Sequence, residues 1–244
     1  MHRTVLITGA SSGVGHALTH HLASDYRVIA VARRIDRLRE AFGTYANVEC
    51  VELDLSDSGQ LREFTQGLPQ RYGYIPYLIN NAGVNIRVEV SELTHEQLSR
   101  SVAVNAVAPL ALMQALLPQM QQENFGRIIN VTSGAPLNCF AQFGAYSASK
   151  AALNALSVTA AREYQDYNIK INLMSPGPVR SEMAPQAPMS PDVAFPTVEY
   201  LLSLPPDGPT GRFFWLGYEI PLFPDLDGIE WLEGRASSRF RKVL

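Results

Sequence analysis

Short apolar runs that alternate with longer segments of helical periodicity constrain the fold of this chain most strongly. The runs are rich in Val and Ile and nearly continuous, as is typical of strands covered by helices on both faces. We expect buried strands at Arg3–Thr8, Tyr26–Ala32, Val48–Leu53, Tyr77–Asn80, Arg127–Ser133 and Lys170–Ser175.

The segments between these runs predict helices that connect one strand to the next. They lie at Val14–Ser24, Ile35–Phe42, Ser58–Pro69, His95–Gln121 and Ala145–Tyr164, with a further short helix at Val193–Leu204. Repeated strand–helix–strand units of this length predict a parallel sheet with right-handed crossovers. One more strand at Arg212–Leu216 brings the expected sheet to about seven strands, whereas the pattern from Tyr218 onward is irregular and predicts no element.

The composition excludes several classes of protein. The chain has 244 residues, 46% of them hydrophobic and 18% charged, which is typical of a globular domain. The formal net charge of −3 gives no electrostatic reason to expect binding to nucleic acid or to an anionic membrane. We identify no apolar stretch of the roughly 18 residues that span a bilayer and no signal-peptide core, and therefore expect a cytoplasmic protein.

Cysteine and histidine show no pattern that indicates a metal site. Cys50 and Cys139 are isolated in the sequence, which favours two reduced thiols. The five histidines include a pair at i, i+4, His16 and His20, without an acidic third ligand. We therefore expect a protein without a metal ion.

The stretch "LITGASSGVGH" ends the first expected strand and opens the first expected helix. Gly9 suits a tight turn, Gly13 permits a phosphate group to approach the backbone, and Gly15 permits close packing of helix on strand. Anions bind well at a helix N-terminus, because free amide groups and the helix dipole both favour negative charge there. The spacing is G-x-x-x-G-x-G rather than G-x-G-x-x-G, so this motif alone is equally compatible with a purely structural turn.

Further polar motifs follow the ends of later strands. "NNAG" at Asn80–Gly83 follows the fourth, Ser133 closes the fifth, and Pro176–Gly177 ends the sixth. In "YSASK", Tyr146 and Lys150 are four residues apart and project from one helix face. A lone Y-x-x-x-K is usually a surface pair, but ligands of parallel sheets bind beyond the carboxyl ends of the strands, where all these motifs lie.

These motifs, in this order, resemble those of the short-chain dehydrogenases/reductases of about 250 residues. The resemblance covers Arg3 to about Ser181 and rests on "TGASSGVG", "NNAG", Asn105 in "VNAVAPL", Ser133, "YSASK" and "PGPV". "LPPDGPTGRFFW" at Leu204–Trp215 resembles the C-terminal segment of carbonyl-reductase-like members. Ser181 stands where the family often has Thr, so a hydroxyl remains. The resemblance implies one α/β domain over residues 1–244, a Rossmann-type doubly wound parallel sheet with helices on both faces, and a small substrate lid and helix at 182–204.

The catalytic residues implied by the resemblance are Asn105, Ser133, Tyr146 and Lys150. A carbonyl that accepts a hydride also needs a proton, and Tyr146 is the candidate donor, although a free phenol has a pKa of about 10. We expect Lys150 and a positively charged nicotinamide to lower that pKa. Ser133 can donate to the developing alkoxide. By resemblance, Lys150 also binds the cofactor ribose and Asn105 holds a water that connects Lys150 with solvent.

The end of the second strand indicates which dinucleotide binds. Ala32 stands where family members that use NAD carry Asp, and Arg33 can pair with a 2′-phosphate. Against this, Ser12 rather than a basic residue precedes Gly13, and the alternative is that the two arginines are simply solvated before a helix. We expect NADP rather than NAD, with Asp54 accepting a hydrogen bond from adenine. The residues expected to bind it are Gly9, Ser11, Ser12, Gly13, Val14, Gly15, Arg33, Arg34, Asp54, Leu55, Asn81, Ala82, Gly83, Tyr146, Lys150, Pro176, Gly177, Val179 and Ser181.

The sequence therefore predicts an NADP(H)-dependent oxidoreductase that interconverts a carbonyl and a secondary alcohol. The alternative is a non-catalytic NADP(H)-sensing or scaffolding protein on the same fold. A mostly apolar set near the expected pocket favours an apolar or aromatic substrate, although several of its members can equally pack the lid. It comprises Asn85, Ile86, Pro136, Leu137, Phe140, Phe143, Met183 and Met189. The resemblance implies that two long helices, around Val104–Gln121 and Ala148–Tyr164, form an interface between subunits. The first is apolar enough to need a cover beyond the sheet, so we expect a homodimer or homotetramer.

Overall fold

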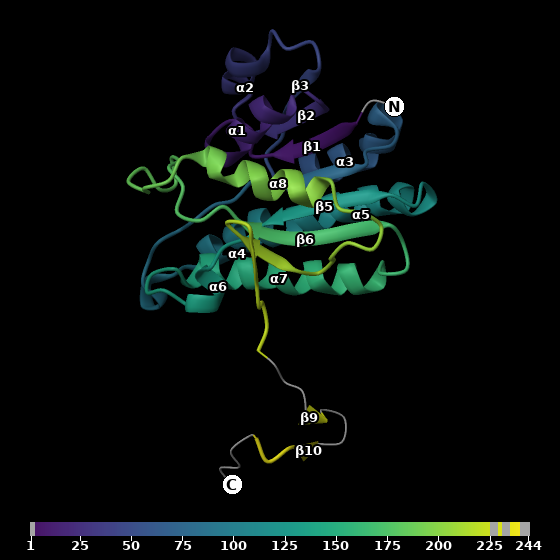
Figure 1. The fold of residues 1–244 in the computed structure, drawn as a ribbon. Helices are drawn as coiled ribbons and strands as arrows, with labels where there is room; N and C mark the ends of the chain where they lie inside the picture. The colour runs from purple at the N-terminus through teal and green to yellow at the C-terminus, as the bar shows by residue number, and fades with distance from the viewer. Residues whose placement is uncertain (1–2, 225–228, 231–234, 240–244) are drawn as a thin grey trace.

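A mostly parallel sheet of eight strands forms the centre of the molecule (Figure 1). The computed structural model describes residues 3–224, 229–230 and 235–239. The strand order is β3-β2-β1-β4-β5-β6-β7-β8, so the chain runs outward from β1 to one edge and then from β4 to the other. The strands are β1 (Thr4–Thr8), β2 (Arg27–Ala32), β3 (Val48–Glu52), β4 (Tyr77–Asn80), β5 (Gly126–Val131), β6 (Ile169–Ser175), β7 (Phe213–Trp215) and β8 (Tyr218–Ile220). This order confirms the doubly wound Rossmann-type fold.

The sheet has one strand more than the expected number of about seven, because β8 turns back and pairs antiparallel with β7. Trp215 lies opposite Tyr218, and the two residues between them, Leu216 and Gly217, have φ of 49° and 83°. Two successive residues with positive φ make the tight turn that joins antiparallel strands. Beyond β8, Ile229–Glu230 (β9) and Arg235–Ala236 (β10) form a separate antiparallel pair.

Helices cover both faces of the sheet, because successive side chains of a buried strand point to opposite sides. In β1, Val5 and Ile7 belong to one apolar cluster and Leu6 to the other. The first face is covered by α1 (Gly13–Leu22), α2 (Ile35–Phe42) and α8 (Phe195–Leu202), the last of which is preceded by the short turn Pro191–Ala194. The second face is covered by α3 (Ser58–Tyr72), α5 (Ala108–Gln122) and α7 (Gly144–Glu163).

The helix expected at His95–Gln121 is divided by a wider turn. It consists of α4 (His95–Val102), a π-helical segment at Ala103–Val107 and α5. By length and composition only, the helix His95–Gln122 could cross a membrane, because it contains an 18-residue window with a mean hydropathy of 1.5. This corrects the expectation that the chain has no apolar stretch of that length. Of that apolar window, 56% is buried inside the protein, as in a core helix packed on a sheet.

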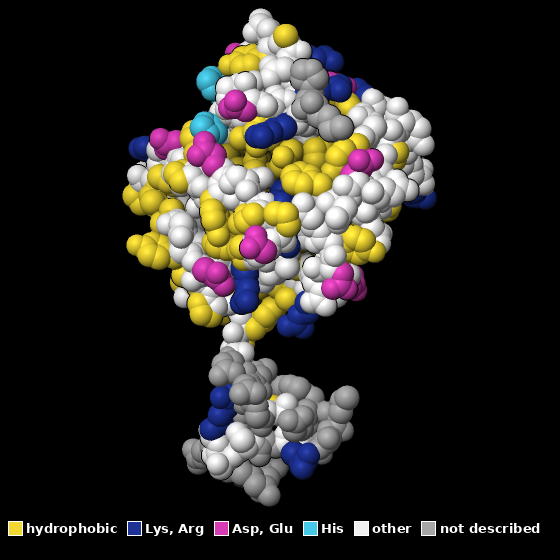
Figure 2. Space-filling view, turned by 45° about the vertical axis from the view of Figure 1, so that its right-hand side comes forward, with side chains coloured by type: hydrophobic (Ala, Val, Ile, Leu, Met, Phe, Trp, Pro, Cys, Tyr) yellow, Lys and Arg dark blue, Asp and Glu magenta, His cyan; other side chains and the backbone are white. Residues whose placement is uncertain are grey.

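The predicted strand at Arg127–Ser133 ends earlier than expected, at Val131. The chain then enters a short helix, α6 (Ala135–Asn138), which the sequence pattern did not predict. Ser133 therefore lies just beyond the strand. Over the face drawn in Figure 2, basic and acidic side chains are interspersed around hydrophobic ones, in keeping with the small net charge.

Candidate functional site

A cavity of about 310 Å³ lies beyond the carboxyl ends of the central strands. It is located where the order of the sheet reverses, between β1 and β4, which is the usual ligand site of a doubly wound fold. All residues that the sequence predicted to be catalytic or to bind the cofactor line it, except Gly15 and Asn105. Motifs distant in the sequence therefore converge on one site, as expected.

The glycine turn between β1 and α1 forms one wall. Gly9 and Gly13 have φ of +70° and +55°, which residues with a side chain rarely adopt. A Cβ on Gly15 would lie 2.3 Å from the carbonyl oxygen of Gly9, so Gly15 is the contact that lets the helix pack on the turn. Its absence from the cavity wall follows from this packing role. A Cβ on Gly13 would lie 3.1 Å from the Cβ of Ser181, in the loop after β6.

Ser133, Tyr146 and Lys150 meet at one end of the cavity, called the catalytic end below. A hydrogen bond joins the side chains of Ser133 and Tyr146. One turn further along α7, Lys150 is buried and its Nζ donates to the carbonyl oxygen of Val131 at 2.7 Å. That nitrogen lies 5.9 Å from the centre of the Tyr146 ring.

Burial dominates the protonation of both groups. It raises the pKa of the Tyr146 phenol, and the hydrogen bond from Ser133 lowers that pKa only in part. Burial lowers the pKa of the Lys150 ammonium to about 8. Lys150 is not among the groups that shift the pKa of Tyr146 in this structure, in which its Nζ donates to the carbonyl of Val131, so a lowering of that pKa by Lys150 together with a bound nicotinamide stays a prediction.

Asn105 lies behind the cavity wall, in the π-helical segment, and is fully buried. Its Oδ1 accepts from the amide of Val84 at 2.8 Å, and its Nδ2 donates to the carbonyl of Val84 and to Oγ of Ser149, both at 2.9 Å. These bonds fix the loop after β4 against α7. The role of Asn105 in holding a water stays a prediction, whereas its positioning role is visible here.

The opposite end, called the phosphate end below, carries arginines from the chain after β2. Arg33 lies 3.8 Å from the carboxylate of Asp54, whose other oxygen accepts from the amide and hydroxyl of Ser56. Arg34 donates to the hydroxyls of Ser11 and Ser12 at 3.3 and 3.0 Å. This end therefore gathers exposed guanidinium groups beside the glycine turn.

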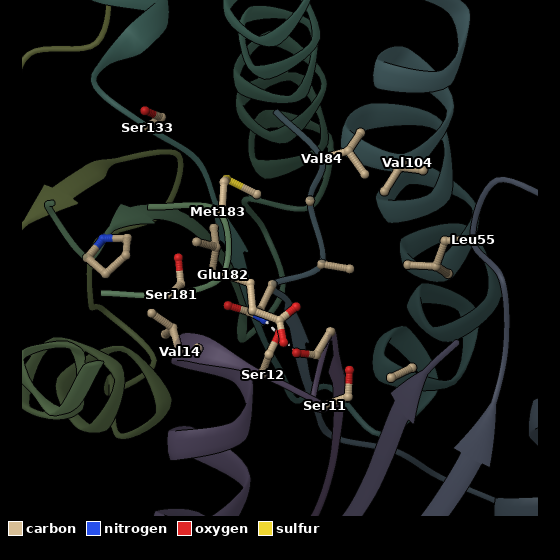
Figure 3. A pocket seen from close by; sticks show the side chains of 18 of the residues that line it. Ser11, Ser12, Val14, Leu55, Val84, Val104, Ser133, Ser181, Glu182 and Met183 are labelled. Carbon is tan, nitrogen blue, oxygen red and sulfur yellow. Dashed lines mark hydrogen bonds between the residues drawn. The ribbon is translucent and has the colours of Figure 1, made fainter. Parts of the chain in front are cut away.

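Sequence reasoning missed some wall residues and misplaced others. Arg100 and Val104 line the cavity and are four residues apart, so the spacing on their helix could have indicated them. Glu182 also lines it, and no local signal marked this residue (Figure 3). Of the eight residues expected near the substrate, only Met183 is in the wall. The segment after Ser133 turns outward through α6, which leaves Leu137 and Phe140 exposed.

Within the described residues, no three His, Cys, Asp or Glu side chains are grouped so that they could hold a metal ion. The expectation of a metal-free protein stays a prediction.

Comparison with known proteins identifies the family. Residues 3–191 match the family model of the short chain dehydrogenases. A probable short-chain type dehydrogenase/reductase from Helicobacter pylori is 34% identical over 177 residues, which cover 72% of this chain and 65% of that protein. In this and two other similar curated proteins, the matched segment spans only 59% to 65% of the relative's length.

Solved structures of the same fold are similar over nearly their whole length. NADPH-bound carbonyl reductase from chicken fatty liver is 26% identical with a TM-score of 0.80, covering 90% of this chain and 98% of that one. A metagenomic short-chain oxidoreductase in complex with NADP is 30% identical with a TM-score of 0.77 (87% and 96%). A 4-hydroxyisoleucine dehydrogenase complexed with NADH is 27% identical with a TM-score of 0.82 (87% and 96%). From the family match, the converging motifs and the shared fold, we conclude that this chain belongs to the short-chain dehydrogenase family.

Proposed function

We propose that the protein is an NADP(H)-dependent oxidoreductase that interconverts a carbonyl and a secondary alcohol by hydride transfer. The observation that carries this proposal is the arrangement of Ser133, Tyr146 and Lys150 at one end of a cavity that has guanidinium groups at its other end. Membership of a family of oxidoreductases supports the reaction class. Similar structures with NADPH and NADP support the cofactor, while a similar structure with NADH shows that the fold accommodates both.

The residues present fit a dinucleotide. The turn at Gly9 and Gly13 opens on the N-terminus of α1, and Ser12 precedes that helix without a side-chain capping bond of its own. Free amide groups at this position suit a pyrophosphate. The backbone of Asn81–Gly83 and of Pro176–Val179 lines the cavity between its two ends. When bound, the nicotinamide supplies or accepts the hydride.

The protein's own residues then manage the proton. Ser133 holds the Tyr146 phenol by a hydrogen bond and can donate to the oxygen of a substrate carbonyl. Tyr146 gives its proton to that oxygen during reduction and takes it back during oxidation. Because burial keeps the pKa of Tyr146 high, the phenol is protonated at neutral pH and ready to act as the acid. Lys150, one turn further along α7 with its Nζ held by the carbonyl of Val131, takes the role of binding the cofactor ribose that the family resemblance implies for it.

The proposed substrate is a small apolar or aromatic carbonyl or alcohol. Val84, Val104 and Met183 in the cavity wall support an apolar compound. We also propose a homodimer or homotetramer, supported by the apolar window of the helix at residues 95–122, of which only 56% is buried inside the protein. A cytoplasmic location is proposed from the sequence alone.

The test is oxidation of NADPH, and of NADH in parallel, against a panel of aromatic, aliphatic and quinone carbonyls, with Tyr146→Phe as the control. We expect turnover with NADPH and a loss of about 10²- to 10⁴-fold in kcat for the variant, the range that a positioned general acid contributes. Cofactor affinity should stay within about twofold, since the phenylalanine keeps the ring. A preference for NADH would overturn the cofactor assignment. Binding of NADPH without turnover in either direction would instead support the sensing or scaffolding function.

A further inference from the structure

Glu182 closes an ion-pair bridge across the phosphate end of the cavity. It lies in the loop after β6, within the segment expected to be the lid, and its two carboxylate oxygens bind different guanidinium groups. Oε2 accepts from Arg34 at 2.6 Å and Oε1 pairs with Arg37. Both arginines belong to the start of α2, so the bridge connects two segments on opposite sides of the site. Figure 3 shows the Glu182 side chain beside that of Ser12.

Arg34 occupies the middle of this bridge. Its guanidinium donates to Ser11 and Ser12 on the glycine turn as well as to Glu182. Its three partners are therefore side-chain oxygens on the cavity wall: two neutral hydroxyls and the negatively charged carboxylate of Glu182. An anionic group that enters this end of the cavity would therefore meet the guanidinium of Arg34. In this structure the carboxylate of Glu182 already binds that guanidinium.

The neighbouring contacts keep the bridge at the cavity. Ser181 packs against Gly13, so the backbone beside Glu182 is held on the glycine turn. Ala184 and Ser181 exchange backbone hydrogen bonds, which makes the loop a tight turn at Glu182 and Met183. The charged groups themselves remain partly exposed, with 37% of the Arg34 and 52% of the Glu182 side chain accessible. Exposed ion pairs contribute little free energy and exchange partners readily.

We propose that Glu182 is an internal anion that competes with the 2′-phosphate of the dinucleotide for Arg34, and thereby determines how strongly the protein prefers NADP(H) to NAD(H). This inference rests on the proposed function only in assuming that a dinucleotide binds in the cavity. A phosphate monoester carries a charge of about −1.5 to −2 at pH 7. The 2′-phosphate must therefore displace the Glu182 carboxylate from Arg34, or bind beside it against electrostatic repulsion. NAD(H) has a hydroxyl in that position and meets no such competition. Glu182 therefore weakens the binding of one cofactor and not of the other.

The experiment measures the dissociation constants of NADP⁺ and NAD⁺ by calorimetry for the wild type and for Glu182→Gln, which removes the charge and keeps the shape. We expect NADP⁺ to bind about three- to fivefold more tightly to the variant, the range that an exposed ion pair implies, while NAD⁺ stays within about 1.5-fold. Glu199→Gln is the matched control: Glu199 is also half-exposed and paired, with His21, but is not in the cavity wall. It should leave both constants unchanged.

Equal tightening of NADP⁺ and NAD⁺ in Glu182→Gln would overturn the inference, because the lid would then close over either cofactor. Weaker binding of NADP⁺ would overturn it too, since Glu182 would then be orienting Arg34 for the phosphate. The same measurements separate this inference from the proposed function. Selective tightening of NADP⁺ in a protein without turnover leaves the inference standing and overturns only the oxidoreductase. Binding of neither dinucleotide by the wild type overturns both.

Discussion

The two ends of the cavity are built on different physical principles. At the catalytic end, Asn105, Ser149 and Lys150 are buried, and each is hydrogen-bonded to backbone or to a neutral side chain. At the phosphate end, Arg34 and Glu182 are partly exposed and are held by charge. A buried hydrogen bond is costly to leave unmade, so it fixes position, whereas an exposed ion pair can exchange one partner for another. The comparison teaches that reaction geometry and cofactor preference are controlled separately in one cavity.

The strongest test of this contrast is the stability of Asn105→Ala. The substitution removes the partner of the amide and carbonyl of Val84 and one of the two hydrogen bonds of the Ser149 hydroxyl, which still donates to the carbonyl of Tyr146. We expect it to lower the free energy of unfolding by about 2–4 kcal/mol, measured by urea denaturation. Glu182→Gln, at the other end, should change that free energy by less than about 0.5 kcal/mol. Similar losses in the two variants would remove the distinction between the ends.

The pH dependence of stability tests the buried charge of Lys150. Its pKa is about 8 in the folded protein and 10.5 in the absence of burial. Between these two pKa values the unfolded state binds more protons than the folded state, so the free energy of unfolding rises with pH. This gain is lost as the pH falls through 8, where the buried amine of the folded protein also becomes charged. Relative to Lys150→Met, the wild type should gain about 2–3 kcal/mol in free energy of unfolding between pH 8 and pH 10. The measurement is urea denaturation of both proteins across this range, and a difference that does not vary with pH contradicts the assignment.

The smallest of the expected effects is a different response of the two ends of the cavity to ionic strength. Charges at the phosphate end are screened by ions, and those at the catalytic end are shielded from solvent. Between 50 and 500 mM NaCl we expect the dissociation constant of NADP⁺ to rise a few-fold more than that of NAD⁺. The kcat at saturating cofactor should change by less than about twofold. A fall in kcat that parallels the loss of NADP⁺ affinity would show that the ends are coupled.

The sequence by itself determined most of the sheet. The strands from β1 to β6 were predicted to within two residues at every end, because each is a short apolar run between segments of helical period. The wall of the cavity was also predicted, since motifs at the carboxyl ends of parallel strands must lie at one edge. The hairpin of β7 and β8 was missed although Gly217 carried a local signal for it.

Only the tertiary structure decided how charged residues are used. Arg127 was expected as an ordinary strand residue, yet it is 1% exposed and donates to the carbonyl of Leu204, 77 residues away. The bridge from Arg34 to Glu182 spans 148 residues. The pKa of Tyr146 is governed by burial rather than by its neighbour Lys150. Local pattern shows which residues form an element, whereas desolvation and pairing depend on which distant segments the fold brings together.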